Sequence, residues 1–341
     1  MQSQQRLPFG FTGYGGEYFR IWIVNVLLTV LTLGIYSAWA KVRRTQYFYR
    51  NSWLHSANFD YHGDPVAILK GRVIAVTLFI AYNFSIKFSP LLGLTIGVLI
   101  ALIMPLLLLK SFRFRSINSS YCGLRFGFSS TPRRAYKTFL LLPILTGFTL
   151  YLLAPFTHQR IKFFQHNNSR FGKTPFQFDA GAGAFYKLYG ITVLLYLAAI
   201  LTSGLVIAFG FRMASLHNAN PLAAGIFVGM VILISLLAIG PYFVSRLQNL
   251  VWNHTTLGEH RFESWITARG LFWVQLTNLL AIIFTLGLFK PFADIRLVRY
   301  RLQHMALLAN DDLKTFVADE QQQVGAAGEE TAEIFDLDIA F

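Results

Sequence analysis

Eight histidines are the first side chains to test for chemistry, because histidine serves both as a metal ligand and as a general base. They are His55, His62, His158, His166, His217, His254, His260 and His304. The closest groupings, His254 with His260 and His62 with Asp64, lack the HExxH or paired-cysteine spacing of a zinc site. GxSxG, Walker and dinucleotide-binding motifs are absent as well. We therefore expect no enzyme, no metal and no cofactor, and we interpret the histidines as solvated loop residues.

Two asparagines, Asn25 and Asn278, are the second set, because they lie at matching places inside apolar runs. Polar groups in such runs often mark a substrate path. They also form hydrogen bonds between neighbouring helices. We favour the interhelical bond and keep a pore or substrate role open. The runs contain no carboxylate, which argues against proton- or sodium-coupled transport.

Basic residues at the ends of the apolar runs are the third set. Lysine and arginine at such places reach lipid phosphates. The candidate head-group contacts are Lys41, Arg43, Arg44, Lys110, Arg113, Arg160, Arg246, Arg296 and Arg299. Membrane lipids, mainly anionic ones, are the expected partners. The same composition also marks the cytoplasmic loops of membrane proteins, and this simpler interpretation stays open. No nucleic-acid recognition motif is present, so we expect no nucleic-acid partner.

Composition indicates which elements carry these residues. Hydrophobic residues make up 54% of the chain and charged ones 13%, against about 25% charged in soluble domains. About 20 apolar residues cross a bilayer as a helix. Stretches without Asp, Glu, Lys or Arg cover 21–40, 88–109, 138–159, 188–211, 213–245 and 270–289, with a weaker one at 73–86. We predict a multi-pass membrane protein with four to seven spans, and no cleaved signal peptide at its start.

Short aromatic elements recur along the chain. They are FGF at Phe9, FDY at Phe59, FGF at Phe126, FQF at Phe176 and FES at Phe262. Each precedes an apolar helix and then a basic segment, and a polar turn leads to the next element. The predicted fold is an all-α multi-pass membrane protein with five homologous helix modules and short cytoplasmic β-strands between them, within residues 1–310. The modules span 9–58, 59–125, 126–175, 176–261 and 262–310.

The first and last modules align directly with an offset of 253 residues, counted from Phe19 and Phe272. Nine positions are identical, including Asn25 with Asn278 and the run Thr-Leu-Gly at 32–34 with that at 285–287. We predict the same local structure in both, namely a helix, a break at Thr-Leu-Gly and a second amphipathic helix.

Two topologies follow from the basic segments, which cover 41–50, 110–115, 160–173, 246–269 and 296–301. If all lie in the cytoplasm, modules one, three and five must enter the membrane and return. If every apolar run crosses instead, modules three and four repeat the three crossings of modules one and two in the inverted orientation, as in many transporters. We favour the one-sided arrangement, because short strands on one face can pair with each other.

The first 72 residues carry six motifs: F-x-F-x-G at 9–13, E-Y-F at 17–19, T-L-G-I-Y at 32–36, W-A-K-V-R at 39–43, F-D-Y-H-G-D-P at 59–65 and L-K-G-R at 69–72. In these the chain resembles the YjgN-like family of bacterial inner-membrane proteins. Because the last module repeats the pattern, the resemblance extends to about residue 310. It implies an inner-membrane location and a multi-pass fold, and it implies no activity, substrate or cofactor.

The C-terminal segment 311–341 falls outside this pattern. Up to Met305 the chain has 29 Lys and Arg against seven Asp and Glu, whereas residues 306–341 have one lysine and nine acids. We expect a flexible acidic tail. Residues 319–341 also contain apolar side chains, so docking onto the basic part of the chain and binding of a protein partner are both open. No sequence feature indicates an oligomeric state.

For the whole chain, a non-enzymatic transport or lipid-interacting role is the leading functional hypothesis. A structural or scaffold protein of the cell envelope is the alternative. A transporter should place Asn25 and Asn278 on a cavity, whereas a scaffold should lose a fixed partner when 319–341 is deleted.

Overall fold

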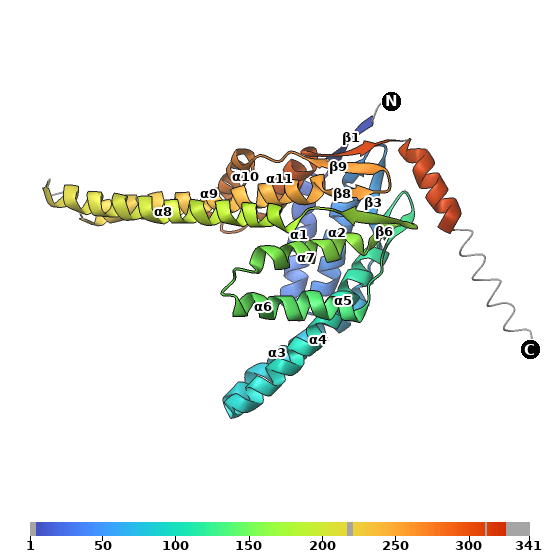
Figure 1. Ribbon diagram of the computed structural model, residues 1–341, viewed down its shortest axis with the longest axis horizontal. Coiled ribbons are helices and arrows are strands. Elements are labelled where there is room, and N and C mark those ends of the chain that lie inside the picture. Colours follow the sequence, from blue (N-terminus) through green and yellow to red (C-terminus); the bar gives the residue numbers. More distant parts are fainter. Residues whose placement is uncertain (1–4, 217–220, 311, 325–341) are drawn as a thin grey trace, which may run out of the picture.

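The computed structural model describes residues 5–216, 221–310 and 312–324, and it combines pairs of helices with a small β-barrel (Figure 1). The strands are β1 (Gln5–Phe11), β2 (Ser52–Leu54), β3 (Ala57–Tyr61), β4 (Ser119–Tyr121), β5 (Leu124–Phe128), β6 (Ser169–Phe171), β7 (Thr174–Phe178), β8 (Thr255–Leu257), β9 (His260–Ser264) and β10 (Met305–Ala309). All pairs are antiparallel, and β1 pairs with both β2 and β10, so the sheet closes on itself.

Tight turns join neighbouring strands at one end of the barrel. They link β2 to β3, β4 to β5, β6 to β7 and β8 to β9. Such turns need a positive φ, and it occurs at His55 (54°), Gly123 (80°), Gly172 (57°) and Gly258 (56°). Helices make the remaining connections, so every helix pair between two strands leaves from the opposite end of the barrel.

Two long helical hairpins project from that opposite end (Figure 1). One pairs α3 (Pro65–Phe88) with α4 (Pro90–Ile117), and the other pairs α8 (Ala182–Leu216) with α9 (Pro221–Asn253). Asp64 caps α3 by accepting hydrogen bonds from the backbone N–H groups of Val66 and Ala67. The helices α3 and α4 and residues Ala182–Gly210 are long and apolar enough to cross a membrane.

Three shorter hairpins lie between and beside the long ones. The first pairs α1 (Gly15–Leu31) with α2 (Ser37–Arg50), and the last pairs α10 (Ala268–Phe284) with α11 (Lys290–Gln303). The middle one contains α5 (Pro132–Tyr136), the π-helical turn η1 (Lys137–Leu141), α6 (Leu142–Phe148) and α7 (Ala154–Asn167). The helix–break–helix prediction for the first and last modules is thus confirmed.

Each short hairpin turns at a left-handed residue that donates its N–H to a carbonyl five residues earlier. These bonds run from Gly34 to Thr29, from Tyr151 to Thr146 and from Gly287 to Ile282, with distances of 2.8–2.9 Å. This is the 6→1 bond of a Schellman motif. The tips are apolar and exposed, with Leu33 at 95% and Leu286 at 94%. Such tips are stable in lipid and unfavourable in water.

The barrel corrects the expected fold class. The predicted short strands exist, and each aromatic element lies in one of them. They do not form an open layer in an all-α protein, because closure pairs both edge strands and removes the exposed edges. With three to seven residues each, the strands are shorter than the about nine that a spanning strand needs. One closed barrel favours the one-sided arrangement, because the inverted one would put its strands on both membrane faces.

Residues 313–324 form a helix that packs against the turn end of the barrel, although the composition of 311–341 predicted a flexible tail. The reason is the spacing of Leu313, Phe316 and Val317, which puts three apolar side chains on one face of a helix. Leu313 and Val317 are buried in the barrel's hydrophobic cluster, and Phe316 packs against it. The part of the predicted tail at 325–341 lies outside the described residues.

Candidate functional site

Five phenylalanines form a closed ring inside the barrel. They are the first residues of the five aromatic elements, Phe9, Phe59, Phe126, Phe176 and Phe262. Neighbouring ring centroids lie 6.1–6.5 Å apart all the way around, and interplanar angles of 14–28° make the rings nearly parallel. Each phenylalanine is thus within the aromatic contact range of about 4.5–7 Å of both its neighbours in the ring. The five side chains therefore form a continuous apolar ring around the inside of the barrel.

A second inward layer lies on the partner strands. In register with the phenylalanines are Leu54, Tyr121, Phe171, Leu257 and Leu307. All five are buried, whereas Phe9, Phe59, Phe126 and Phe176 remain partly exposed although they face inward. Barrels of about eight strands are just filled by their side chains, and wider ones enclose space. The interior of the ten-stranded barrel is therefore lined by apolar and aromatic side chains.

The helix 313–324 closes the turn end of this interior. Its Phe316 stacks on Phe171 with 6.2 Å between centroids and meets His260 edge-on at 4.6 Å. His260 is only 2% exposed, so it is not the solvated loop residue that we expected. At the helix end, Gln321 Nε2 donates to the Cys122 carbonyl oxygen at 2.7 Å. The helix thus contacts several strands and covers the mouth of the barrel.

Glu320 anchors the helix, and it is only 4% exposed. Its carboxylate accepts hydrogen bonds from the backbone N–H groups of Lys173 at 2.6 Å and Thr174 at 3.3 Å, and from the Thr174 hydroxyl. Gly172 precedes them with φ of 57°, and a Cβ there would lie 2.2 Å from Glu320 Oε2. The β6–β7 turn thus binds a carboxylate from the chain's own tail, because successive N–H groups in such a turn attract anions.

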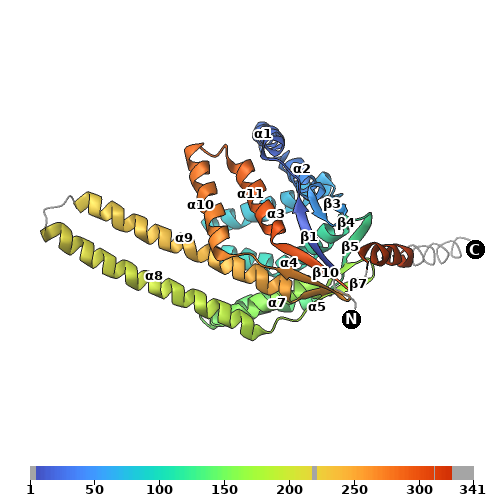
Figure 2. The same ribbon diagram turned by 90° about the horizontal axis from the view of Figure 1, so that it is seen from above.

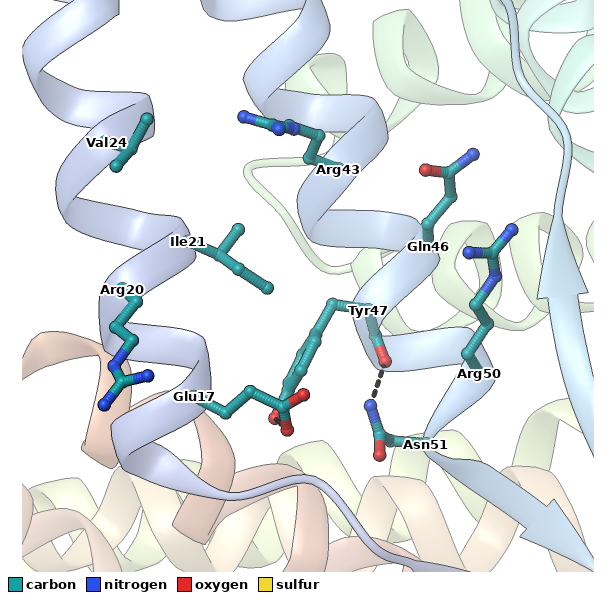
Figure 3. Close-up of a pocket in the computed structure, with 9 residues that line it drawn as sticks. All are labelled: Glu17, Arg20, Ile21, Val24, Arg43, Gln46, Tyr47, Arg50 and Asn51. Atoms are coloured by element: carbon teal, nitrogen blue, oxygen red, sulfur yellow. Dashed lines mark hydrogen bonds between the residues drawn. The ribbon is translucent and has the colours of Figure 1, made fainter.

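A groove between α1 and α2 lies where the helices meet the barrel (Figure 3). It is a cavity of about 520 Å³, lined by Glu17, Arg20, Ile21, Val24, Arg43, Gln46, Tyr47, Arg50 and Asn51. Figure 3 shows Glu17 and Tyr47 meeting between the helices, where the tyrosine hydroxyl donates to the carboxylate at 2.9 Å. Burial, with this hydrogen bond, raises the pKa of Tyr47 to about 12. Tyr47 therefore remains a donor at neutral pH.

The nine predicted head-group residues all lie on helices, eight of them exposed and Arg299 partly buried. Some are already engaged within the protein. Arg44 pairs with Asp294 at 3.1 Å, Arg113 donates to the Ser130 carbonyl at 2.6 Å, and Arg299 donates to that of Gly13 at 2.7 Å. Arg43 and Arg296 donate to the hydroxyls of Tyr36 and Thr277, both at 3.0 Å.

The remaining head-group candidates have fewer partners within the protein. Arg160 lies over the Phe156 ring at 4.9 Å, and Arg246 lies over that of Tyr242 at 5.7 Å. Lys41 and Lys110 are exposed. Of the nine, the structure brings only Arg43 into the groove. The predicted set is therefore distributed around the helices and does not form one site.

The two asparagines are buried in their hairpins. Asn278 Nδ2 donates to the Ala293 carbonyl at 3.2 Å, which links α10 to α11. This is the interhelical bond that we favoured. Asn25 is 6% exposed, and neither residue lines the groove. Their side-chain oxygens have no hydrogen-bond partner among the described residues. Asn278 thus holds its hairpin together.

Sequence reasoning missed three features of the site. It placed the aromatic elements on strands but did not predict that their first residues form a ring. The reason is that the pairing register between strands of different modules is a tertiary property. It also missed the buried Glu320 and the contribution of Arg20 to the groove. The spacing of Leu313, Phe316 and Val317 carried a signal for the docked helix, because residues three and four apart share a helix face.

Comparison with known proteins extends these observations. Residues 6–334 match a family described as bacterial proteins of unknown function (DUF898). The chain belongs to this family. It is similar to the inner membrane protein YjgN of Salmonella typhimurium, with 26% identity over 361 residues that cover 91% of each chain. The YjgN protein of Escherichia coli K12 is 32% identical over 143 residues, which cover 40% of this chain and 35% of that one. No solved structure matches the chain.

Family membership agrees with the geometry of the molecule. The named relatives are inner-membrane proteins, and among the described residues three helices have the length and composition to cross a bilayer. The protein is therefore a member of the DUF898 family located in the inner membrane. The expected resemblance to YjgN-like proteins is confirmed, and it covers nearly the whole chain.

Proposed function

We propose that this protein is a non-enzymatic membrane protein that passes small solutes through its β-barrel. The observation that carries the proposal is the closed ring of five phenylalanines inside a closed barrel, at the base of membrane-length helices. Apolar constrictions gate channels by excluding water from the pore. On this proposal the ring is the constriction and the helix 313–324 is a cover over the mouth.

We also propose that the five modules are structural repeats around the barrel axis, with the one-sided arrangement that puts the barrel in the cytoplasm. Equivalent hydrogen bonds support this. In each module the helix that leads back to the barrel, here called the return helix, is followed by a residue whose side chain hydrogen-bonds to the backbone carbonyl four residues earlier. These residues are Asn51, Asn118, Asn168, His254 and His304. The backbone carbonyl of the same residue accepts a second hydrogen bond, from the backbone N–H of the residue that follows the aromatic element. In chain order these donors are Thr12, His62, Ser129, Asp179 and Trp265.

The electrostatic asymmetry favours this orientation. Up to Met305 the chain carries a large excess of Lys and Arg, and the exposed members of the predicted set lie on the helices that join the barrel. Lysine and arginine in short loops stay on the cytoplasmic side of the membrane. A basic membrane face also raises the local concentration of anions. The proposed cargo is accordingly a small anion.

Flux through reconstituted protein tests the proposal. The full chain, in liposomes filled with a chloride-quenched dye, should conduct weakly while 313–324 covers the mouth. Removal of 311–341 should raise chloride flux several-fold. Replacement of Phe126 by Ala in the shortened chain should raise it again, because a wider and less apolar constriction stays wet.

The matched control is Phe163→Ala, which truncates a phenylalanine on the outside of α7. Its flux should equal that of the parent protein. Circular dichroism and size-exclusion chromatography establish that each variant is folded, because loss of a packed phenylalanine costs about 3–5 kcal/mol. Equal chloride flux in empty liposomes, the full chain and both altered chains contradicts the proposal. A scaffold protein would instead lack flux and lose a fixed partner on removal of 319–341.

A further inference from the structure

We infer that the groove between α1 and α2 binds the phosphate head group of an anionic phospholipid. This inference does not rest on solute passage through the barrel. The groove has a volume of about 520 Å³, within the usual range for small-molecule sites of about 300–1,000 Å³. Three arginines line it, Arg20 from α1 and Arg43 and Arg50 from α2.

The charge of the groove is not neutralised within the protein. Arg50 pairs with Asp60 at 2.9 Å. Among the described residues, Arg20 and Arg43 form no ion pair. Glu17, the only acid of the groove, is bound by the Tyr47 hydroxyl. The exposed guanidinium groups of Arg20 and Arg43 thus have no acidic partner, and Arg43 donates one hydrogen bond to the Tyr36 hydroxyl at 3.0 Å. Their planar donor pattern fits phosphate oxygens.

The groove is polar next to the barrel, and apolar side chains of α1 line it farther out, where Arg43 of α2 lies across from Val24 (Figure 3). Going along α1 from the barrel, Glu17 and Arg20 come first, and Ile21 and Val24 follow. Beyond them Leu27 and Leu31 are exposed on the same helix, toward the apolar tip of the hairpin. A phospholipid has the same order of phosphate and acyl chain. A free phosphate ester would contact only the first part of this surface.

The last hairpin, which aligns with the first, does not repeat this cluster of arginines. At the positions of the last hairpin that align with Arg20 and Arg50 lie Trp273 and Gln303. Arg296, which aligns with Arg43, donates to Thr277 on its own hairpin at 3.0 Å. The last hairpin also has Arg299 at the position that aligns with Gln46, and Arg299 donates to the Gly13 carbonyl at 2.7 Å. The groove thus gathers three cations, whereas the aligned surface has two, both bonded within the protein.

Lipid retention by purified full-length protein tests the inference. Native mass spectrometry in detergent compares phosphatidylglycerol, phosphatidylcholine and soluble glycerol phosphate at equal concentrations. The protein should retain phosphatidylglycerol at least tenfold better than either competitor. The double variant Arg20→Gln/Arg43→Gln should lose this preference, and Arg43→Lys should weaken it, because lysine keeps the charge but not the two-pronged contact.

The matched control is Arg125→Gln, which removes an exposed arginine from strand β5 at the other end of the barrel. It should retain phosphatidylglycerol as well as the parent does. Unchanged lipid retention in both groove variants overturns the inference. Binding of glycerol phosphate as tight as that of the lipid also overturns it, since the apolar half of the groove would then be irrelevant. Retention of phosphatidylcholine equal to that of phosphatidylglycerol does so as well.

Discussion

His166 lies where the return helix α7 meets the barrel, between the rings of Phe178 and Trp252. Its Nδ1 is 3.2 Å from the Thr255 hydroxyl, which belongs to strand β8. Burial, with the nearby charge of Lys162, lowers the pKa of His166 from 6.5 to about 4. The neutral imidazole is therefore the form that the folded protein stabilises.

This gives a pH dependence of stability. The unfolded chain protonates His166 below pH 6.5, whereas the folded chain does so only near pH 4. Unfolding thus takes up a proton between these values, and stability falls as the pH is lowered through this window. The contribution is at most about 3 kcal/mol. Thermal unfolding in detergent should show a melting temperature that decreases from pH 7 to pH 4.

The variant His166→Gln isolates this residue from other titrating groups. Glutamine keeps a polar side chain of similar size that does not titrate, so its melting temperature should change less over the same pH range. His55→Gln, at an exposed hairpin turn, is the matched control and should follow the parent. A parallel decrease in the parent and His166→Gln would show that other groups cause the effect.

At the scale of elements, the structure repeats a few hydrogen-bond arrangements at the ends of helices. Left-handed residues end the first helix of each short hairpin, and side chains of asparagine or histidine close the return helices. These hydrogen bonds satisfy carbonyl groups that a helix end leaves without partners. The helix 313–324 differs, because it is held by tertiary contacts and by one buried carboxylate. Its docking should therefore be separable from the rest of the fold.

Replacement of Glu320 by Ala should release this helix. The variant loses three hydrogen bonds to the β6–β7 turn and leaves two backbone N–H groups without their carboxylate, at a cost of about 2–4 kcal/mol. Hydrogen exchange of 313–324 should become at least tenfold faster, while exchange in the barrel strands is unchanged. Asp319→Ala, at the exposed neighbouring acid, is the control. Equal protection in both variants would contradict the anchoring role of Glu320.

The whole molecule consists of a barrel at one end and helical hairpins that diverge from it at the other (Figure 2). If the barrel lies on one side of the bilayer, as we propose, the three short hairpins must enter the membrane and return. Their apolar tips are consistent with this. The helices α3 and α4 and residues Ala182–Gly210 have the length and composition to cross. Topology is therefore a property of the barrel as much as of the hydrophobic runs.

Cysteine labelling tests this topology. In a Cys122→Ser background, single cysteines at Ser56, Ser129, Ser169 and Thr256 should all react with an impermeant maleimide from the cytoplasmic side only. Ser89→Cys, in the turn between α3 and α4, is the opposite control and should react from the other side. Labelling of the first two from one side and the last two from the other would restore the inverted arrangement.

The sequence alone determined much of this protein, including the membrane location, the aromatic elements, the helix breaks at Thr-Leu-Gly and the family. These features follow from local composition and spacing, which one segment contains in full. Closure of the barrel, the ring of phenylalanines, the burial of Glu320 and the groove of Arg20 with Arg43 depended on tertiary structure. Each requires a register or a contact between residues far apart in the chain, and neither periodicity nor composition specifies which segments meet.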